Sequence, residues 1–305
     1  MNVQIIIPIY YPDFKFEKLL EQIKKQTEKN ISLLIIDSGS NDEYNKLLTG
    51  LNAEIIEINA ENFNHGGTRQ MGINKCPNKD IYIFLTQDAV LADKFAIERL
   101  VAVFADTKIG CAYGRQLPHK NANVFAAFAR KFNYPNASYV RSYEDRKKYG
   151  MKTAFLSNSF AAYRKEAMAD VGGFPTNTIL SEDMYVAAKM LKNGWDVAYV
   201  ADACVYHSHN YTIWQEFKRY FDIGVFHARE KLIRDEFGKA EGEGKKFVGS
   251  EINYLLSNKP LGILEMILRD LMKFLGYRLG IIEKNIPKFI KMKISMSTMY
   301  WKLNK

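Results

Sequence analysis

The feature that most constrains the fold is a regular alternation of short apolar runs and helical segments over the first 117 residues. The apolar runs are rich in Ile, Val and Leu and predict buried strands, while apolar residues spaced by three and four predict helices between them. The predicted strands are 3–8, 31–36, 54–58, 80–85 and 110–116, and the predicted helices are 14–27, 40–49, 67–76 and 92–105. Strands apolar on both faces that alternate with helices predict an α/β fold with a Rossmann-like, mostly parallel sheet flanked by helices.

The alternation stops after this first part of the chain. Residues 118–154 are polar and aromatic and predict loops with one short helix. Further on, we expect order at 155–164, a helix at 182–192, a strand at 197–200, a short strand ending near His207 and helix through 212–237. The stretch GKAEGEGKK predicts a hinge before a helical C-terminal segment that begins near Ser250.

Composition limits the class of protein. With 305 residues, 47% hydrophobic and 25% charged, the chain can bury a core and is unlike a disordered protein. Its three cysteines have no CxxC spacing, which argues against disulfides and structural zinc and for a reducing cytoplasm. No leader peptide is visible and no window reaches the ~20 apolar residues of a spanning helix. We therefore expect any membrane contact to be peripheral.

Positive charge gathers at the C-terminal end. From Arg269 onward the chain has nine bases and two acids, so +7 of the net +9 lies there. A helical apolar stripe precedes and overlaps this region, at Leu264, Ile267, Leu268, Leu271, Leu275, Leu279 and Ile282. Such a stripe with basic flanks predicts either contact with an anionic membrane surface or a final helix packed on the core, and both remain open.

Acidic residues occur in order at strand ends and at the start of a helix: Asp37, Asp88 and the pair Glu182-Asp183. In open α/β sheets, ligands bind beyond the carboxyl ends of the strands. Asp37 can bind a nucleobase or ribose, or cap the next helix. Asp88 can hold Mg²⁺ or Mn²⁺, or belong to a turn. The pair in the first turn after Ser181 can supply a general base, or only cap the helix and complement its dipole.

Two further motifs carry polar groups. His207 and His209 follow an apolar strand, and His207 is our preferred candidate to complete a metal shell, the alternative being a satisfied polar histidine. The sequence NHGGTR precedes a helix, a setting where free amides favour anions. Arg69 can offer a fork to phosphate there, although a glycine pair is also an ordinary hinge.

Taken together, the motifs resemble the family-2 glycosyltransferases, which have the GT-A fold, and in particular their bacterial rhamnosyltransferase-like members. The resembling segments span about residues 3–215 and part of the tail. They are IIIPIYYP, LLIIDSGSNDE, NFNHGGTRQMG, YIFLTQDAVL, SNSFAAYRKEAMADVGGF, SEDMYVAAKMLKNGWDVAYVADACVYHSHNYT and KFLGYRLG. The family inverts the anomeric centre by direct displacement, so the resemblance implies that no covalent nucleophile is needed.

The resemblance also implies roles for individual residues. Asp183 falls on the catalytic base, with Glu182 beside it. Asp88 falls on the metal-binding motif, but Gln87 stands where the family has its first acid, so we expect His207 to help hold Mg²⁺ or Mn²⁺. The expected donor-nucleotide residues are Pro8, Tyr10, Asp37, Ser38, Gly67, Arg69 and Gln87.

The expected organisation is a GT-A catalytic domain, 1–235, with a nucleotide-sugar half (1–117) and an acceptor half (118–235). A basic helical extension, 236–305, provides possible membrane attachment. We expect an inverting transferase that moves L-rhamnose from dTDP-rhamnose onto a hydroxyl of a lipid-linked glycan in cell-surface polysaccharide synthesis. Its expected place is the cytoplasm, on the inner face of the bacterial plasma membrane.

Alternatives are a transferase for another UDP- or dTDP-sugar, or a non-catalytic protein that binds nucleotide sugars or nucleic acid. A nucleic-acid partner is not expected, because aromatics are sparse in the basic tail. A dehydrogenase would need GxGxxG after the first strand, where this chain has PIYYPD, and a nucleotidyltransferase would need its glycine-rich loop there too. Oligomeric state stays open.

Overall fold

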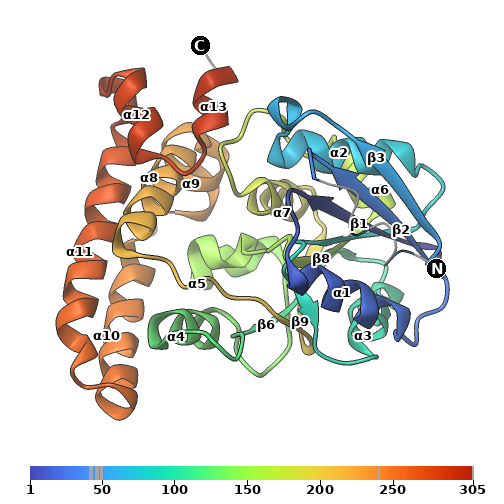
Figure 1. The fold of residues 1–305 in the computed structure, drawn as a ribbon, viewed down its shortest axis with the longest axis horizontal. Coiled ribbons are helices and arrows are strands. Elements are labelled where there is room, and N and C mark those ends of the chain that lie inside the picture. The colour runs from blue at the N-terminus through green and yellow to red at the C-terminus, as the bar shows by residue number, and fades with distance from the viewer. Residues whose placement is uncertain (41–43, 45–47, 49–50, 239–240, 304–305) are drawn as a thin grey trace.

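A computed structural model describes the chain from residue 1 to 303, apart from residues 41–43, 45–47, 49–50 and 239–240. The helix predicted at 40–49 falls largely outside the described residues. The remaining elements form one sheet with helices on both faces and a group of helices at one side (Figure 1).

The sheet has the strand order β3-β2-β1-β4-β8-β6-β9-β5, and β7 also pairs with β9. Its strands are β1 (Val3–Ile9), β2 (Ile31–Asp37), β3 (Ala53–Glu57), β4 (Ile81–Leu85), β5 (Val90–Leu91), β6 (Ile109–Leu117), β7 (Tyr139–Arg141), β8 (Phe160–Arg164) and β9 (Asp196–Tyr206). The first four strands in chain order are parallel, as are β6 and β9. Strands β5, β7 and β8 run antiparallel to their neighbours, so the sheet is mixed and mostly parallel, which confirms the predicted fold class.

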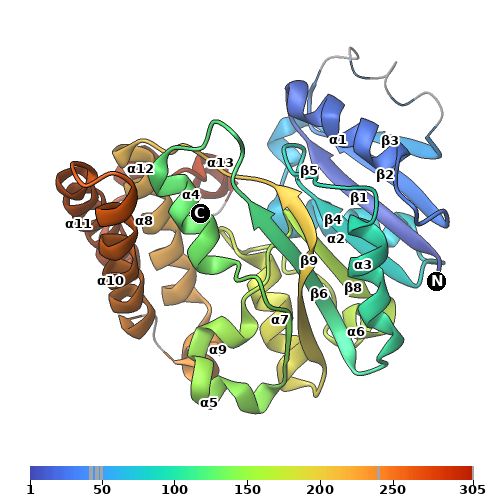
Figure 2. The same ribbon diagram turned by 90° about the horizontal axis from the view of Figure 1, so that it is seen from below.

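Helices cover the two faces of this sheet separately (Figure 2). On one face lie α1 (Phe14–Lys24) and α3 (Ala96–Ala102), and on the other lie α2 (His65–Lys75), α6 (Lys165–Asp170) and α7 (Glu182–Lys192). Alternation along β1 directs Ile5 and Ile7 to the first face and Ile6 to the second. This two-sided burial explains why the strand sequences are apolar throughout.

The segment 118–154 is more ordered than the predicted loops. It contains α4 (Val124–Asn133), α5 (Arg146–Tyr149), β7 and two 3₁₀ turns, η4 (Tyr143–Asp145) and η5 (Gly150–Ala154). Phe125, Phe128 and Tyr134 of this segment are buried, and the hydroxyl of the half-buried Tyr139 lies 2.7 Å from that of Tyr113 on β6. Likewise, the two strands predicted at 197–207 are the single strand β9.

The C-terminal part consists of α8 (Ile213–Arg229), α9 (Lys231–Phe237), α10 (Glu241–Asn258), α11 (Gly262–Ile281), α12 (Lys288–Ile294) and α13 (Thr298–Leu303). Short 3₁₀ turns η2 (Ala60–Asn62), η3 (Val103–Ala105) and η6 (Glu283–Asn285) complete the elements. The predicted hinge was wrong from residue 241 onward, where α10 begins. The glutamates and lysines of this stretch favour a helix and outweigh its glycines.

Glycines let α11 approach α8 closely. A Cβ added at Gly280 would overlap the carbonyl oxygen of Phe221, and one at Gly276 would overlap that of Phe217. Gly224 of α8 lies directly against the backbone of Gly280. The two helices therefore pack backbone to backbone, which ties the C-terminal extension to the domain that precedes it.

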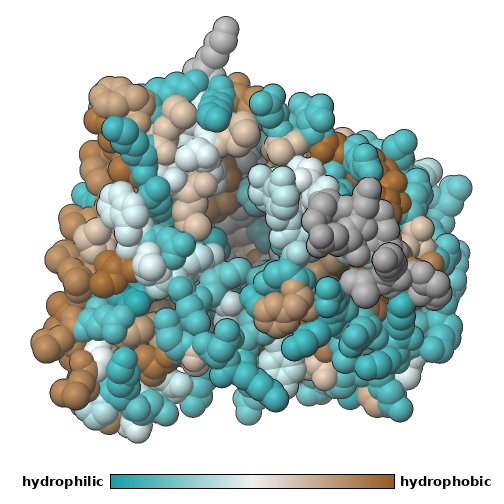
Figure 3. All heavy atoms as spheres, in the orientation of Figure 1, coloured by the Kyte–Doolittle hydropathy of each residue, from teal (hydrophilic) through white to brown (hydrophobic). Residues whose placement is uncertain are grey.

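The apolar stripe of α11 faces solvent, not the core. Leu264 is 79% exposed and Leu271 is 51% exposed, whereas Arg269 and Lys273 are buried on the opposite side of the helix. Figure 3 shows these apolar side chains along the edge of the molecule over α11. Within the described residues, no helix combines the length and apolarity needed to span a bilayer.

Candidate functional site

A cleft of about 730 Å³ opens between the carboxyl edge of the sheet and helices α4, α8 and α11. Its lining includes Asp88, Glu182, Asp183 and both His207 and His209. These residues come from the ends of β4 and β9 and the start of α7. The cleft thus collects the predicted metal and base residues in one place.

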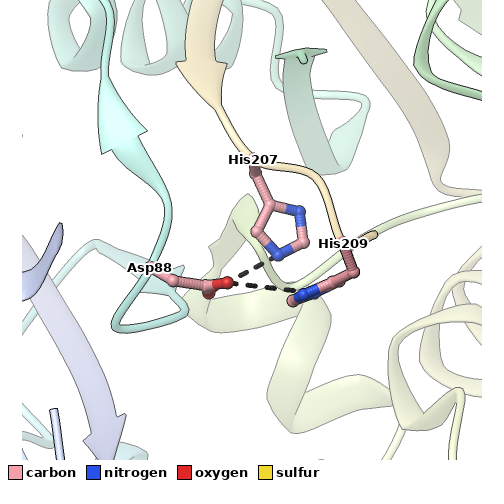
Figure 4. A group of neighbouring side chains, drawn as sticks. All are labelled: Asp88, His207 and His209. Carbon is pink, nitrogen blue, oxygen red and sulfur yellow. Dashed lines mark ion pairs between the residues drawn. The ribbon is translucent and has the colours of Figure 1, made fainter. Parts of the chain in front are cut away.

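Asp88, His207 and His209 form a compact cluster (Figure 4). Nε2 of His207 lies 3.5 Å from Oδ1 of Asp88, and Nε2 of His209 lies 3.8 Å from Oδ2. One atom of each side chain lies within 4.8 Å of the other two. The structure therefore brings the predicted residues Asp88 and His207 together. It also brings in His209, although the sequence favoured His207 over His209 as the metal ligand.

Gln116, at the end of β6, orients His207. Its side-chain nitrogen donates to Ser157 Oγ at 2.9 Å, so Oε1 faces Nδ1 of His207, also at 2.9 Å. A carbonyl oxygen only accepts, so Nδ1 is the donor, and in the neutral ring the lone pair of Nε2 is directed at Asp88. A metal-binding histidine commonly has this arrangement, with its other nitrogen held by an acceptor.

The donor set suits a divalent cation. One carboxylate and two imidazoles offer oxygen and nitrogen ligands, which Mn²⁺ accepts and which Mg²⁺ accepts in part. Burial would raise the pKa of Asp88, but a protonated His207, which donates from Nε2 and carries a positive charge, followed by the charge of His209, holds that pKa well below its usual value. Burial, together with the positive charge of His207, lowers the pKa of His209 to about 4. The carboxylate form of Asp88 and the neutral form of His209 are the forms that bind metal.

Glu182 and Asp183 lie at the first turn of α7 and differ sharply in their surroundings. Glu182 is 4% exposed and forms an ion pair with Arg69, Oε1 to Nη1, at 3.1 Å. The side-chain amide of Asn158 also donates to Glu182 Oε1 at 2.9 Å. Asp183 has no cation paired with it among the described residues and instead accepts from the backbone N–H of Asn158 at 2.9 Å. It is partly exposed to the cleft.

These surroundings separate the two pKa values. Burial and the negative charge of Glu182 raise the pKa of Asp183 to about 7. Burial also opposes ionisation of Glu182, but Arg69 and the donors around Glu182 lower its pKa on balance. Two adjacent carboxyls with separated pKa values are a common arrangement for an acid–base site, because only one of them is poised near neutral pH.

Backbone geometry fixes where this pair lies. Ser181 has left-handed torsion angles, φ 57° and ψ 34°, and its side chain makes no cap hydrogen bond, contrary to the capping interpretation. Gly66 at the start of α2 lies against the carbonyl of Pro175, where a Cβ would overlap. The loop before α7 is therefore held tightly against α2, next to the ion pair of Arg69.

The predicted nucleotide residues at the strand ends are interlinked. Asp37 is 4% exposed, and its Oδ1 accepts from the N–H groups of Gly39 (3.0 Å) and Ser40 (2.8 Å). Ser38 Oγ donates to the carbonyl of Ile9 at 2.7 Å. A second hollow of about 810 Å³ is lined by Asp37, Gly39, Ser40 and residues of the β3 end.

Gln87 joins this region to the metal cluster. It accepts from the N–H of Tyr10 at 2.7 Å and donates to the carbonyl of Tyr10 at 3.1 Å. Tyr10 follows Pro8 and Ile9 at the end of β1, and its ring is 55% exposed. Gln87 therefore holds the backbone of Tyr10 at the end of β1, and the Tyr10 ring remains exposed.

Gly67 and Arg69, both predicted to bind the donor nucleotide, have hydrogen-bond partners within the protein. The N–H of Gly67 donates to Asn64 Oδ1 at 2.8 Å, so the helix start is already capped. Arg69 is 5% exposed and donates to the carbonyl of His65 as well as pairing with Glu182. In this structure, Arg69 joins α2 to α7 through Glu182, while Gly67 lies at the capped start of α2, next to Thr176.

Sequence reasoning missed several residues of the site: Gln116, Arg130, Asn158, Tyr163 and Arg219. Asn158 lies in the SNSF motif and binds both carboxylates, while Tyr163 donates to its Oδ1 at 2.6 Å. Gln116 directly ends an apolar strand, the same signal that singled out Asp37 and Asp88. Arg219 lies within a helix and carried no such signal.

Comparison with known proteins identifies the family. Residues 4–172 match the model of glycosyl transferase family 2. The chain is 49% identical to the O-antigen chain rhamnosyltransferase RfbN of Salmonella typhimurium, over 99% of this chain and 96% of that protein. It is 44% identical to the O-antigen chain rhamnosyltransferase WbaN of Salmonella anatum, over 97% and 95% of the two chains.

Solved structures agree on the fold. The mannosyltransferase PcManGT of Pyrobaculum calidifontis, in complex with GDP-Man and Mn²⁺, matches with a TM-score of 0.63 at 15% identity, covering 93% of this chain and 87% of that one. TarS 1–349 of S. aureus, in complex with UDP-GlcNAc, matches with a TM-score of 0.57 at 14% identity, covering 98% and 85%. With this fold and the full-length relatives, the chain belongs to glycosyl transferase family 2 and is a glycosyltransferase of the GT-A fold.

Proposed function

We propose that this enzyme transfers L-rhamnose from dTDP-rhamnose to a hydroxyl of a lipid-linked glycan, with inversion, during synthesis of a cell-surface polysaccharide. The named activities of the two Salmonella relatives, which align over nearly the whole chain, support the sugar and a glycan chain as acceptor. The observation that carries the proposal is the single cleft that contains both Asp183, with its raised pKa, and the Asp88 cluster.

Asp183 is the general base of the proposed reaction. A base needs a pKa near the working pH, so that it is ionised before transfer and still takes up the proton of the acceptor hydroxyl. That hydroxyl oxygen attacks the anomeric carbon of the donor as the bond to the nucleotide diphosphate breaks, and its proton passes to Asp183. Glu182, already paired with Arg69 and Asn158, keeps Asp183 basic by its charge and takes no proton itself.

Asp88, His207 and His209 would hold a Mg²⁺ or Mn²⁺ ion. When bound, such an ion stabilises the negative charge that develops on a departing diphosphate. Gln116 keeps Nε2 of His207 available for this role by accepting from Nδ1. The complex of PcManGT with Mn²⁺ supports a metal in this fold, and the lone carboxylate here makes the two imidazoles essential to it.

The donor nucleotide lies along the ends of β1 and β2 in this proposal. The ring of Tyr10 offers a face on which a base can stack, next to Pro8. Asp37, with Ser38 behind it, faces the base or the ribose, and Gln87 fixes Tyr10. Of the other predicted donor residues, Arg69 acts indirectly by holding α7 and its carboxylates in place, and Gly67 belongs to the capped start of α2.

The enzyme works at the cytoplasmic surface of the bacterial plasma membrane in this proposal. The outer face of α11 exposes Leu264, Ile267, Leu268, Leu271, Phe274 and Leu275 together. Exposed Lys284, Lys288 and Lys293 follow it in sequence. An apolar helix face followed by lysines is suited to an anionic lipid surface, where a lipid-linked acceptor resides. The region 1–235 then acts as the catalytic part and 236–305 as the attachment.

The experiment that tests the proposed function is a panel of nucleotide sugars, with and without Mn²⁺. Binding of the true donor raises the melting temperature by mass action. We expect dTDP-rhamnose to give the largest rise and to be the donor consumed when a glycan acceptor is supplied. A larger rise and faster transfer with another UDP- or dTDP-sugar would contradict the choice of donor, and the absence of any transfer would contradict the enzyme assignment.

A further inference from the structure

Positive charges in the cleft fall into two groups. The lining contains the basic side chains of Arg69, Arg130, Arg219, Arg269 and Lys273. Three of them have carboxylate partners in the protein, at 3.1 Å in each case: Arg69 with Glu182, Arg269 with Glu216, and Lys273 with Asp270. Their charge is neutralised inside the fold, so they have little left to attract a ligand.

Arg130 and Arg219 are different. Among the residues that the structure describes, neither has a carboxylate within ion-pair distance. Arg219, on α8, is exposed to the cleft, with its guanidinium carbon 5.9 Å from the centre of the Tyr211 ring. Arg130, on α4, is half-buried, and its Nε is buried without a hydrogen-bond partner in the described structure. A buried donor without a partner is costly, which favours a ligand that supplies an acceptor.

Both arginines are linked to the metal cluster, from two sides. The Tyr211 ring beside Arg219 stacks on His209, with ring centres 5.2 Å apart and planes at 27°. Arg130 Nη1 donates to the same oxygen of Gln116 that accepts from His207. The guanidinium carbon of Arg130 lies 5.6 Å from the centre of the Tyr134 ring, and Tyr134, Arg130 and Arg219 all line the same cleft.

We propose that Arg130 and Arg219 form a diphosphate-binding subsite beside the Asp88 cluster. Guanidinium groups bind phosphate oxygens through two parallel hydrogen bonds, and two unpaired guanidiniums match the charge of a diphosphate better than that of a monophosphate. The subsite rests on the proposed function, which supplies diphosphates from two sources: the nucleotide-sugar donor and a lipid diphosphate that carries the acceptor glycan.

Lys218 provides a matched control. It precedes Arg219 on α8, carries the same charge, and lies over the ring of Trp214 at 5.8 Å, outside the cleft lining. A general effect of positive charge on α8 would therefore appear with either residue. A diphosphate subsite would respond to Arg219 alone.

The test is isothermal titration of the full chain, at fixed Mn²⁺, with two pairs of probes. The nucleotide pair is dTDP and dTMP, and the lipid pair is farnesyl diphosphate and farnesyl monophosphate. We expect Arg219→Ala and Arg130→Ala to weaken diphosphate binding roughly tenfold or more, because charged hydrogen bonds are lost, with a smaller effect on the monophosphates. We expect the diphosphate affinity of Arg219→Lys to lie between those of wild type and Arg219→Ala, because lysine keeps the positive charge but cannot form the two parallel hydrogen bonds of a guanidinium group. The pair that responds identifies the source of the diphosphate.

Two results would overturn the subsite. The first is that Arg219→Ala and Lys218→Ala bind both diphosphates, dTDP and farnesyl diphosphate, with equal affinity. The second is that the arginine variants lose as much affinity for the monophosphates as for the diphosphates. If the wild-type protein binds dTDP, either result contradicts the subsite but does not contradict the proposed function. Wild-type protein that binds no nucleotide contradicts the proposed function instead, and the subsite is then decided by the lipid pair. Binding of neither pair by wild-type protein overturns both.

Discussion

Nη1 of Arg69 lies 3.1 Å from Oε1 of Glu182, and no cation of the described structure pairs with Asp183, the next residue. This ion pair fixes one carboxylate in its charged form and leaves the other to respond to that charge. Burial and repulsion from Glu182 then bring the pKa of Asp183 close to neutral pH. A base with such a pKa matches the transfer of a sugar to an alcohol near neutral pH.

The first prediction concerns pH. Glu182→Gln keeps an acceptor for Asn158 but removes a negative charge and leaves Arg69 positive, so the pKa of Asp183 should fall. Because the reaction needs ionised Asp183, activity rises with pH through that pKa, and the acid limb of the kcat profile should move to lower pH by about one unit. Rates measured from pH 5 to pH 9 check this. An acid limb that stays in place or moves upward would show that Glu182 does not set the pKa of the base.

The second prediction concerns metal binding. Gln116→Met keeps the side-chain length but removes the acceptor for Nδ1 of His207. We expect the affinity for Mn²⁺ to fall roughly 10- to 100-fold, the usual effect of losing such an orienting partner. Titration of Mn²⁺ by electron paramagnetic resonance measures it directly. Asp93→Asn, which alters an exposed carboxylate paired with Arg99, is the control and should leave the affinity unchanged. Unchanged affinity in Gln116→Met would contradict the role of Gln116.

The third prediction concerns the packing of α11 on α8. Gly280→Val places side-chain atoms where the carbonyl of Phe221 lies, so the helices must separate. Overpacking of this kind costs about 1–3 kcal/mol or more in the free energy of unfolding. Gly249→Ala, on α10 with open space around it, should instead stabilise by about 0.5–1 kcal/mol. Urea unfolding compares the two, and equal stabilities would contradict the close approach.

The fourth prediction concerns the exposed face of α11. The double variant Leu268→Ser with Leu271→Ser should lower binding to anionic vesicles roughly tenfold or more, since two apolar side chains no longer enter the lipid. Its stability should change little, because both side chains are about half exposed.

Val140→Ser, an exposed apolar side chain on β7, is the matched control and should bind like wild type. Flotation with neutral and anionic vesicles, at low and high salt, separates the two contributions. Equal binding to both kinds of vesicle would exclude the lysines, and unchanged binding of the double variant would exclude the apolar face.

Much of the fold could be predicted because local pattern and burial agree in the first 117 residues. The helix at 182–192 has the predicted bounds, since its apolar spacing is clear and its first turn is acidic. The antiparallel direction of β8 could not be predicted, because the apolar pattern of a buried strand does not depend on the direction in which the strand runs. The order of 118–154 depends on hydroxyl–hydroxyl and hydroxyl–carbonyl contacts between residues far apart, such as Tyr199 to Pro135, which no local pattern contains.

The sequence indicated which strand ends and helix start would meet at one edge of the sheet. Asp88, His207 and Asp183 end up in one cleft, because strand ends of the same edge converge. What separates Glu182 from Asp183 is the position of Arg69, 113 residues earlier in the chain, and sequence spacing carries no information about that contact. The sequence also did not indicate which side of α11 faces solvent, since a helix with an apolar stripe normally buries that stripe. Here Gly276 and Gly280 bury the opposite side.

The measurement that tests the central claim most directly is transfer by Asp183→Asn, which keeps the shape of the side chain and removes the base. We predict that kcat for rhamnose transfer falls at least about 100-fold, the usual contribution of a general base, while the Kd for dTDP-rhamnose stays within about threefold of wild type. Turnover close to that of wild type, with the donor bound normally, would contradict the assignment of Asp183 as the base.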